Sequence, residues 1–289
     1  ESGHTICAVY TQPDQPAGRG RGLRPSAVKT EAIALGIPVE EVATLRDDFS
    51  VARLQSYEPD VIVVAAFSHI LPRKVLDLPP HGCLNVHPSL LPRHRGPSPI
   101  AASLLAGDTE TGVTIMLMDE GLDTGPILTQ ERVGIADTDT SGSLADSLAA
   151  LGANLLVDTV DRWTDGDIAP RRQDDLAATY SEKIVARDGL LDWREPAEIL
   201  WRRIRAYSPW PGCYTTWKEK RLKVHAASVA SEVESAEVGC VVPLGGGAGI
   251  ATGRGILKLV TVQLEGKRPV LVEEFVRGQS DFINSSLIL

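Results

Sequence analysis

The chain has 289 residues, of which 43% are hydrophobic and 23% are charged, as is typical of soluble globular proteins of about two domains. No apolar run approaches the roughly 18–20 residues needed to span a bilayer, so we do not expect a membrane protein. The net charge of −9 argues against a protein that coats nucleic acid, but from Leu191 onward 13 Lys and Arg outnumber 11 Asp and Glu, so a polyanion could bind there.

The spacing of cysteines and histidines predicts neither a disulfide framework nor a metal site. The four cysteines form no Cys-x-x-Cys pair, so we expect all of them to pack as small apolar residues: Cys7, Cys83, Cys213 and Cys240. A reducing, cytoplasmic location fits this usage best. The histidines show no ligand spacing, so no metal is expected.

The first quarter of the chain predicts alternating strands and helices. The opening Glu1-Ser2-Gly3-His4 is typical of a glycine-capped helix end, so we expect a strand and a helix before the printed sequence. A β-branched run predicts a strand at 5–10, and three prolines with several glycines predict an irregular loop at 11–25. Ser26 should cap a helix over 27–35, ended by Gly36 and Pro38.

The continuation keeps this alternation. The apolar run 61–66 is typical of a parallel strand covered on both faces. Further strands are predicted at 83–86, 112–118 and 127–133, and helices at 100–105 and 143–163. This order predicts an α/β fold with a Rossmann-like, mostly parallel sheet and helices on both faces.

The second half predicts a smaller β domain. Residues 165–183 contain few large apolar side chains and are expected to form a surface linker, followed by a helix at 196–207. Short strands separated by glycine-rich turns predict an OB-like β-barrel: 213–217, 222–226, 239–242, 249–252 and 256–263. We therefore predict a catalytic domain over 1–178, a linker over 179–192 and an OB-like domain over 193–289.

Three polar residues suggest acyl-transfer chemistry. Asn85 and His87 are two positions apart, so in a strand their side chains point the same way. An amide can donate to a developing oxyanion, and an imidazole can hold or move a proton. Asp123, in a glycine-flanked turn, could orient or charge the imidazole once folding brings it near. Taken alone, such residues are more often hydrogen-bonded structural groups.

The surrounding residues resemble the folate-dependent formyltransferase family over nearly the whole chain. The resemblance lies in Asn85-Val86-His87-Pro88-Ser89-Leu90-Leu91-Pro92-Arg93, and in the strand Gly112–Asp119 that leads to Gly121-Leu122-Asp123-Thr124-Gly125. In that family Asn-x-His precedes the catalytic Asp by 38 residues, as Asn85 precedes Asp123 here. The family usually opens with a strand and a Gly-Thr-Pro turn, which the printed sequence lacks, and has an aromatic-Gly pair where Phe67-Ser68-His69 stands.

This resemblance implies an activity and its site. Asn85, His87 and Asp123 would be catalytic, and the turn formed by Ser89, Leu90, Leu91 and Pro92 would offer backbone groups to the folate. The formyl donor would be 10-formyltetrahydrofolate, with no metal and no covalent enzyme intermediate. Ser89 is not expected to be a nucleophile, because no Gly-x-Ser-x-Gly elbow surrounds it. We also expect a monomer.

An early loop indicates the acceptor. Residues 11–21, which include Gly18-Arg19-Gly20-Arg21, resemble the loop of those members that formylate methionyl initiator tRNA for translation initiation. Arg19 and Arg21 would then bind tRNA, since guanidinium groups on a flexible loop suit a phosphate backbone. A dinucleotide-binding loop is disfavoured because the third glycine is misplaced, whereas simple solvated charge stays open.

Other family members and other roles remain as alternatives. A sugar-nucleotide N-formyltransferase, a formyl-folate hydrolase and a non-catalytic RNA-binding protein are the three rivals. In the second half, residues 207–212 resemble the start of the family's tRNA-binding C-terminal domain. We expect Trp210 to plug its barrel rather than to stack on a base. Three arginines could form a solvated helix face or line the tRNA path: Arg202, Arg203 and Arg205.

Overall fold

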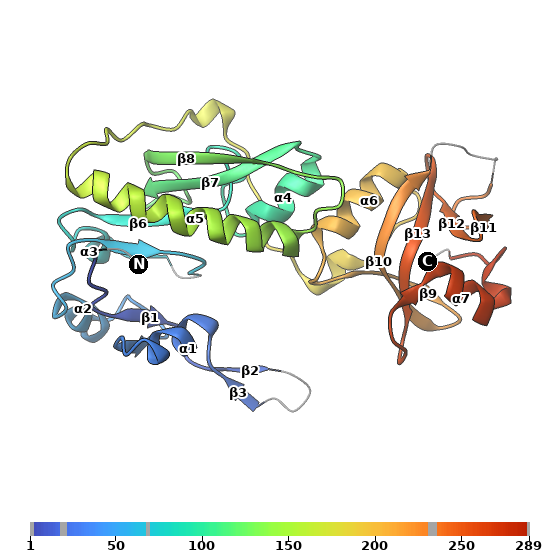
Figure 1. The fold of residues 1–289 in the computed structure, drawn as a ribbon, viewed down its shortest axis with the longest axis horizontal. Coiled ribbons are helices and arrows are strands. Elements are labelled where there is room, and N and C mark those ends of the chain that lie inside the picture. The colour runs from blue at the N-terminus through green and yellow to red at the C-terminus, as the bar shows by residue number, and fades with distance from the viewer. Residues whose placement is uncertain (1–2, 18–21, 68–69, 231–235, 288–289) are drawn as a thin grey trace. The chain divides into compact units, whose positions relative to one another are not determined.

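The structure is a computed structural model that describes residues 3–17, 22–67, 70–230 and 236–287 (Figure 1). The chain divides into two compact units. The first comprises residues 1–95, 113–131 and 150–179, and the second comprises residues 96–112, 132–149 and 180–289. Within the described residues, no helix combines the length and apolar character that crossing a bilayer needs.

The first unit begins with a parallel strand pair. Strand β1 (Val9–Thr11) pairs in parallel with β4 (Val39–Glu41). Helix α1 (Ala27–Ala34) precedes β4, and α2 (Asp48–Gln55) follows it. The predicted α1 and its cap are confirmed, because the Ser26 hydroxyl accepts a hydrogen bond from the Lys29 backbone N–H. Asp47 caps α2 in the same way.

The predicted irregular loop at 11–25 is partly wrong. It contains a short antiparallel hairpin of β2 (Gln15–Ala17) and β3 (Gly22–Arg24), in which Gln15 pairs with Arg24. The tip of this hairpin, with Arg19 and Arg21, lies outside the described residues, as do Ser68 and His69.

A four-stranded sheet is formed by strands from the middle of the chain, between residues 62 and 134. Strand β5 (Ile62–Val64) pairs in parallel with β6 (Cys83–His87), and β6 pairs antiparallel with β7 (Glu110–Leu117), beside which lies β8 (Ile127–Gly134) (Figure 1). Apolar side chains from α2, β5 and the short helix α3 (Arg73–Leu76) form a buried cluster that includes Leu54, Val64 and Val75. Val63 is 43% exposed, so the expectation that both faces of β5 are covered is wrong.

The long helix α5 (Ser141–Thr164) packs against this sheet through a glycine. A Cβ at Gly152 would lie 2.9 Å from Cγ1 of Val86 and 3.4 Å from Cγ1 of Val113. Because that space is occupied, the helix can approach β6 and β7 closely only without a side chain there. The predicted helix over 143–163 is confirmed.

In the second unit, helix α4 (Pro99–Ala106) packs against helix α6 (Ala197–Ala206). The three arginines of α6 are engaged within the unit rather than forming a simple solvated face. Arg202 and Arg203 form ion pairs with Glu198 and Glu195. Arg205 donates to backbone carbonyls of residues 136 and 139 and lies over the Trp201 ring.

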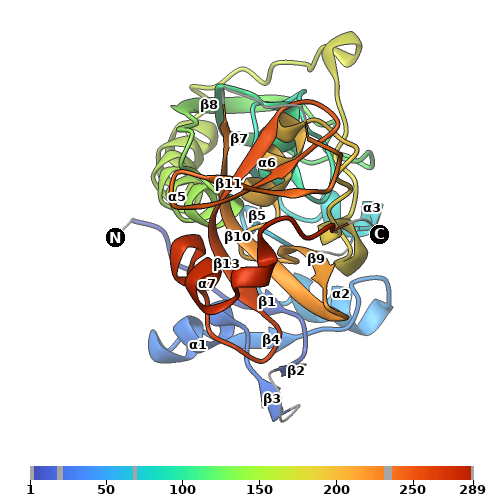
Figure 2. The same ribbon diagram turned by 90° about the vertical axis from the view of Figure 1, so that its right-hand side faces the viewer.

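Strands from residues 213–230 and 241–271 form an antiparallel sheet, on which a helix packs (Figure 2). Its strands lie in the order β11-β12-β13-β10-β9, with β14 on β13. Their bounds are β9 (Cys213–Trp217), β10 (Lys220–Ala230), β11 (Val241–Leu244), β12 (Gly247–Ala251), β13 (Ile256–Leu264) and β14 (Val270–Leu271). Helix α7 (Val272–Gly278) packs on β12 and β13. The predicted α/β fold followed by a smaller β domain is confirmed, and the strands of that domain form one antiparallel sheet. The OB-like barrel stays a prediction.

Aromatic packing in this sheet differs from the expectation for Trp210. Trp217, Phe275 and Phe282 pack edge to face, with ring centroids 5.1–5.7 Å apart. Trp210 is 59% exposed, so the prediction that it plugs the domain is wrong. The cysteine prediction is correct for Cys83 and Cys213, which are buried, and wrong for Cys7, which is exposed.

Leucines of the carboxy-terminal sheet provide a test of its core. Leu222→Ala should destabilise the protein by about 2–5 kcal/mol, because Leu222 is fully buried and a cavity would remain. Leu271→Ala is the matched control, since Leu271 is 58% exposed, and should change stability by less than about 0.5 kcal/mol. Urea denaturation of both variants measures this, and equal losses would contradict the packing.

Candidate active site

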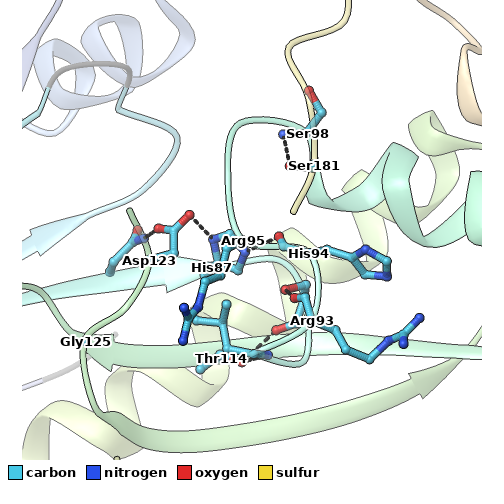
Figure 3. A network of polar contacts seen from close by, with 12 residues as sticks. His87, Arg93, His94, Arg95, Ser98, Thr114, Asp123, Gly125 and Ser181 are labelled. Carbon is cyan, nitrogen blue, oxygen red and sulfur yellow. Dashed lines mark hydrogen bonds and ion pairs between the residues drawn. The ribbon is translucent and has the colours of Figure 1, made fainter. Parts of the chain in front are cut away.

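Two side chains of β6 meet one carboxylate (Figure 3). Asn85 and His87 are two positions apart in the strand, so they lie on the same face of it, as predicted. Asn85 Nδ2 donates to Oδ1 of Asp123 at 3.3 Å, and Nδ1 of His87 lies 3.7 Å from Oδ2 of Asp123. The structure therefore brings together the three residues singled out from the sequence. The His87 and Asp123 side chains are only 5% and 13% exposed.

Asp123 reaches β6 because of the tight turn between β7 and β8. Leu117 N–H donates to the Pro126 carbonyl, and the Asp119 carboxylate accepts from the Gly121 N–H and the Thr124 hydroxyl. Gly125 allows this closure, since a Cβ there would lie 1.8 Å from the Leu117 carbonyl oxygen. Asp123 itself has φ +54°, a left-handed conformation that is uncommon for a residue with a side chain.

The proton of neutral His87 has a defined place. Nε2 lies 3.1 Å from the backbone carbonyl oxygen of His94, which can only accept a hydrogen bond. Nε2 therefore carries the proton, and Nδ1 presents a lone pair toward Asp123. His94 also adopts a left-handed conformation, with φ +58°, and this directs its carbonyl at the imidazole.

Burial controls the charge of this imidazole. Burial is the largest effect on His87 and lowers its pKa below the ordinary value, outweighing the Asp123 carboxylate and the His94 carbonyl, which raise it. His87 is therefore neutral near pH 7. Nδ1 and the Asp123 carboxylate then form two neighbouring acceptors, and an N–H or O–H group placed between them could donate to both.

The turn after β6, expected to contact folate, is held from within. The Thr114 hydroxyl donates to the Ser89 carbonyl and accepts from the Leu91 N–H and from Nε2 of Gln130. Gln130 also donates to the Leu91 carbonyl, and the buried Ser89 hydroxyl donates to the Arg93 carbonyl.

Little of this turn remains for a ligand. Ser89 and Leu91 are buried, whereas Leu90 and Pro92 are partly exposed. The Leu90 N–H has no partner among the described residues. A ligand would therefore meet the Leu90 amide and the apolar surfaces of Leu90 and Pro92.

Two buried polar residues beside this site were not predicted from the sequence. Arg95 is 1% exposed and Gln173 is 4% exposed, and the two side chains are hydrogen-bonded. Gln173 belongs to the stretch 165–183 that was predicted to be a surface linker, and that prediction is wrong at this residue. In the described ranges, no group of His, Cys, Asp and Glu side chains could hold a metal ion.

Known proteins are similar to this chain in sequence and in fold. A formyl transferase family model matches residues 1–160, and a model of the formyl transferase C-terminal domain matches residues 183–280. The chain is 46% identical over 276 residues to the methionyl-tRNA formyltransferase of Roseiflexus sp. (strain RS-1), spanning 95% of this chain and 85% of the relative. It is 44% identical to the methionyl-tRNA formyltransferase of Stutzerimonas stutzeri (strain A1501), and the match spans 100% of this chain and 92% of the relative.

A solved structure extends the likeness in fold. WlaRD, a sugar 3N-formyl transferase crystallised in the presence of dTDP and 5-N-formyl-THF, gives a TM-score of 0.64, covering 92% of this chain and 100% of that chain. Its sequence identity is 16%, so the likeness concerns the fold alone.

The low pKa of His87 predicts how stability depends on pH. The unfolded chain binds a proton at this histidine near pH 6.5, whereas the folded protein binds it only at lower pH. Stability should therefore fall as pH decreases from about 6.5 toward the folded pKa, and His87→Gln should make the loss shallower. Melting temperatures from pH 5 to 8 measure this, with the exposed His225→Gln as control. A parent and a His87→Gln variant with the same slope would contradict the buried neutral imidazole.

Proposed function

Since the chain belongs to the formyl transferase family, we propose that it transfers the formyl group of 10-formyltetrahydrofolate to the α-amino group of methionyl initiator tRNA. Relatives that share 44–46% of its residues over nearly its whole length bear the name methionyl-tRNA formyltransferase. The observation that carries the proposal is the meeting of Asn85, His87 and Asp123 at one largely buried point.

The amine must lose a proton as it attacks the formyl carbon. Neutral His87 offers the lone pair of Nδ1, since its proton is held on Nε2 by the His94 carbonyl. An amine N–H directed between Nδ1 and the Asp123 carboxylate would transfer its proton to Nδ1. The imidazolium so formed pairs with Asp123, 3.7 Å away, and can then donate the same proton to the departing nitrogen.

The formyl oxygen gains negative charge during this addition. Asn85 uses one amide N–H to bind Asp123, and its second N–H has no partner among the described residues. We assign that N–H to the developing oxyanion, where a single donor is typically worth about 10²–10³ in rate. The bond to Asp123 would hold the amide in place, so it needs no reorientation during the reaction.

The folate is proposed to lie against the turn after β6. Leu90 and Pro92 would give apolar contact and the Leu90 N–H a hydrogen bond, while Ser89 and Leu91 would support them from the interior. The sequence predicted that the backbone of all four turn residues contacts folate, whereas we now assign the direct contacts to Leu90 and Pro92 alone.

Recognition of tRNA is proposed for two parts of the chain. Arg19 and Arg21 would contact the phosphate backbone from the tip of the early hairpin. The domain over 193–289 would support tRNA binding, following the catalytic domain over 1–178 and the linker over 179–192. One chain carries every group that this mechanism uses, so we propose a monomer. We also propose a cytoplasmic location, which the free cysteines favour.

Removing the carboxylate tests the chemistry. Asp123→Asn should lower kcat by about 10²–10⁴, because the imidazolium loses its partner while the shape of the side chain is kept. Formyl transfer from 10-formyltetrahydrofolate to charged initiator tRNA measures it. Asp158→Asn removes an exposed carboxylate of the same unit and should leave kcat unchanged. Near-normal turnover of Asp123→Asn would exclude this carboxylate from the reaction.

Removing a guanidinium from the hairpin tests tRNA recognition. Arg19→Ala should raise KM for aminoacyl-tRNA by about tenfold or more, the effect of losing one charge-assisted hydrogen bond, and leave KM for the folate unchanged. Arg46→Ala, which removes an exposed arginine outside the hairpin, is the control. Unchanged tRNA kinetics in Arg19→Ala would make Arg19 a solvated charge.

A further inference from the structure

Gln173 binds the backbone on both sides of the turn that presents Asp123. Its Nε2 donates to the carbonyl oxygens of Asp123 at 2.8 Å and of Gly125 at 2.7 Å. The turn is already closed by the Leu117–Pro126 bond and by Asp119. The two bonds from Gln173 are therefore not needed to form the turn, and they act on the orientation of residues 123–125.

The amide of Gln173 cannot rotate. Its Oε1 accepts from Nε of Arg95 at 3.0 Å and from Nη2 of Arg95 at 2.9 Å. Carbonyl oxygens only accept and a guanidinium only donates, so reversing the amide would leave mismatched groups on both sides. All four hydrogen-bonding positions of this buried amide are filled, and such a group is strongly held.

Arg95 is itself fixed. Its side chain is 2% exposed, and Nη2 forms an ion pair with Asp175 at 2.9 Å. Its backbone N–H donates to the Thr179 carbonyl at 2.9 Å. The buried guanidinium of Arg95 is bonded to both the Asp175 carboxylate and the Gln173 amide, so it holds Gln173 in a fixed position.

The dipeptide His94-Arg95 thus contacts His87 directly and the Asp123 turn through Gln173. The His94 carbonyl holds the imidazole through Nε2, and the next residue, Arg95, holds Gln173, which holds the Asp123 turn. We propose that Gln173, fixed by Arg95, is a positioning residue that sets the Asp123 carboxylate against Nδ1 of His87. This inference rests on the proposed formyl transfer.

A double-mutant cycle separates positioning from mere packing. Gln173→Met keeps the size of the side chain and removes its hydrogen bonds. We expect kcat to fall by about 10²-fold, as for a small displacement of a catalytic group, with KM for folate and tRNA changed less than about threefold. In an Asp123→Asn background, where no carboxylate is left to position, Gln173→Met should lower kcat by less than about threefold.

Two further variants complete the test. Thr159→Val removes a buried hydroxyl that bonds Thr129 and the Leu155 carbonyl away from the site, so it should lower the melting temperature and leave kcat unchanged. Arg95→Lys keeps the charge but not the paired bonds to Gln173. It should show the same loss of kcat and the same dependence on Asp123, and it serves if Gln173→Met does not fold.

The outcomes are distinct. If Gln173→Met lowers kcat equally in the parent and in Asp123→Asn, or leaves kcat unchanged, the positioning role is wrong while the proposed function stands. If the parent protein itself transfers no formyl group to charged tRNA, the proposed function fails first.

Discussion

A carbonyl oxygen can only accept a hydrogen bond, and the chemistry of the site depends on this constraint at His94. Because that carbonyl faces Nε2 of His87, the imidazole keeps its proton on the far side and turns a lone pair toward Asp123. The left-handed conformation of His94 supplies the direction of the carbonyl. Burial then keeps the ring neutral, so that a base rather than an acid faces the carboxylate.

The fold supplies the meeting of residues that are remote along the chain. Strand β6 pairs antiparallel with β7, so Asn85 lies opposite Met116 and His87 opposite Thr114. The β7–β8 turn follows directly and returns Asp123 to the carboxyl end of β6. The β6–β7 pairing, the strand alternation and the glycine-rich turn thereby close a separation of 38 residues.

Much of this could be predicted from local patterns. The Ser26 cap, the long helix α5 and the shared face of Asn85 and His87 each follow from residues within a few positions of one another. The class of the second domain followed from short apolar segments between glycine-rich turns. These features depend on backbone geometry and periodicity, which a sequence displays directly.

What could not be predicted depends on tertiary contacts. Gln173 stands in a polar stretch with no periodicity, and its burial follows from Arg95, 78 residues earlier. Trp210 and Val63 are exposed although aromatic and β-branched residues usually lie inside, because their surroundings rather than their type decide burial. For Arg95, the charged run after the proline-rich turn was the available signal, but charge alone favours solvent.

The Thr114 hydroxyl has a consequence for how the site would receive its ligand. With one bond donated and two accepted, it fastens the turn at Ser89 and Leu91 before anything binds. A surface prepared in this way loses little conformational entropy on complex formation, so more of the contact energy appears as affinity. The backbone of the turn at Ser89 and Leu91 should accordingly be nearly the same in the free and ligand-bound forms.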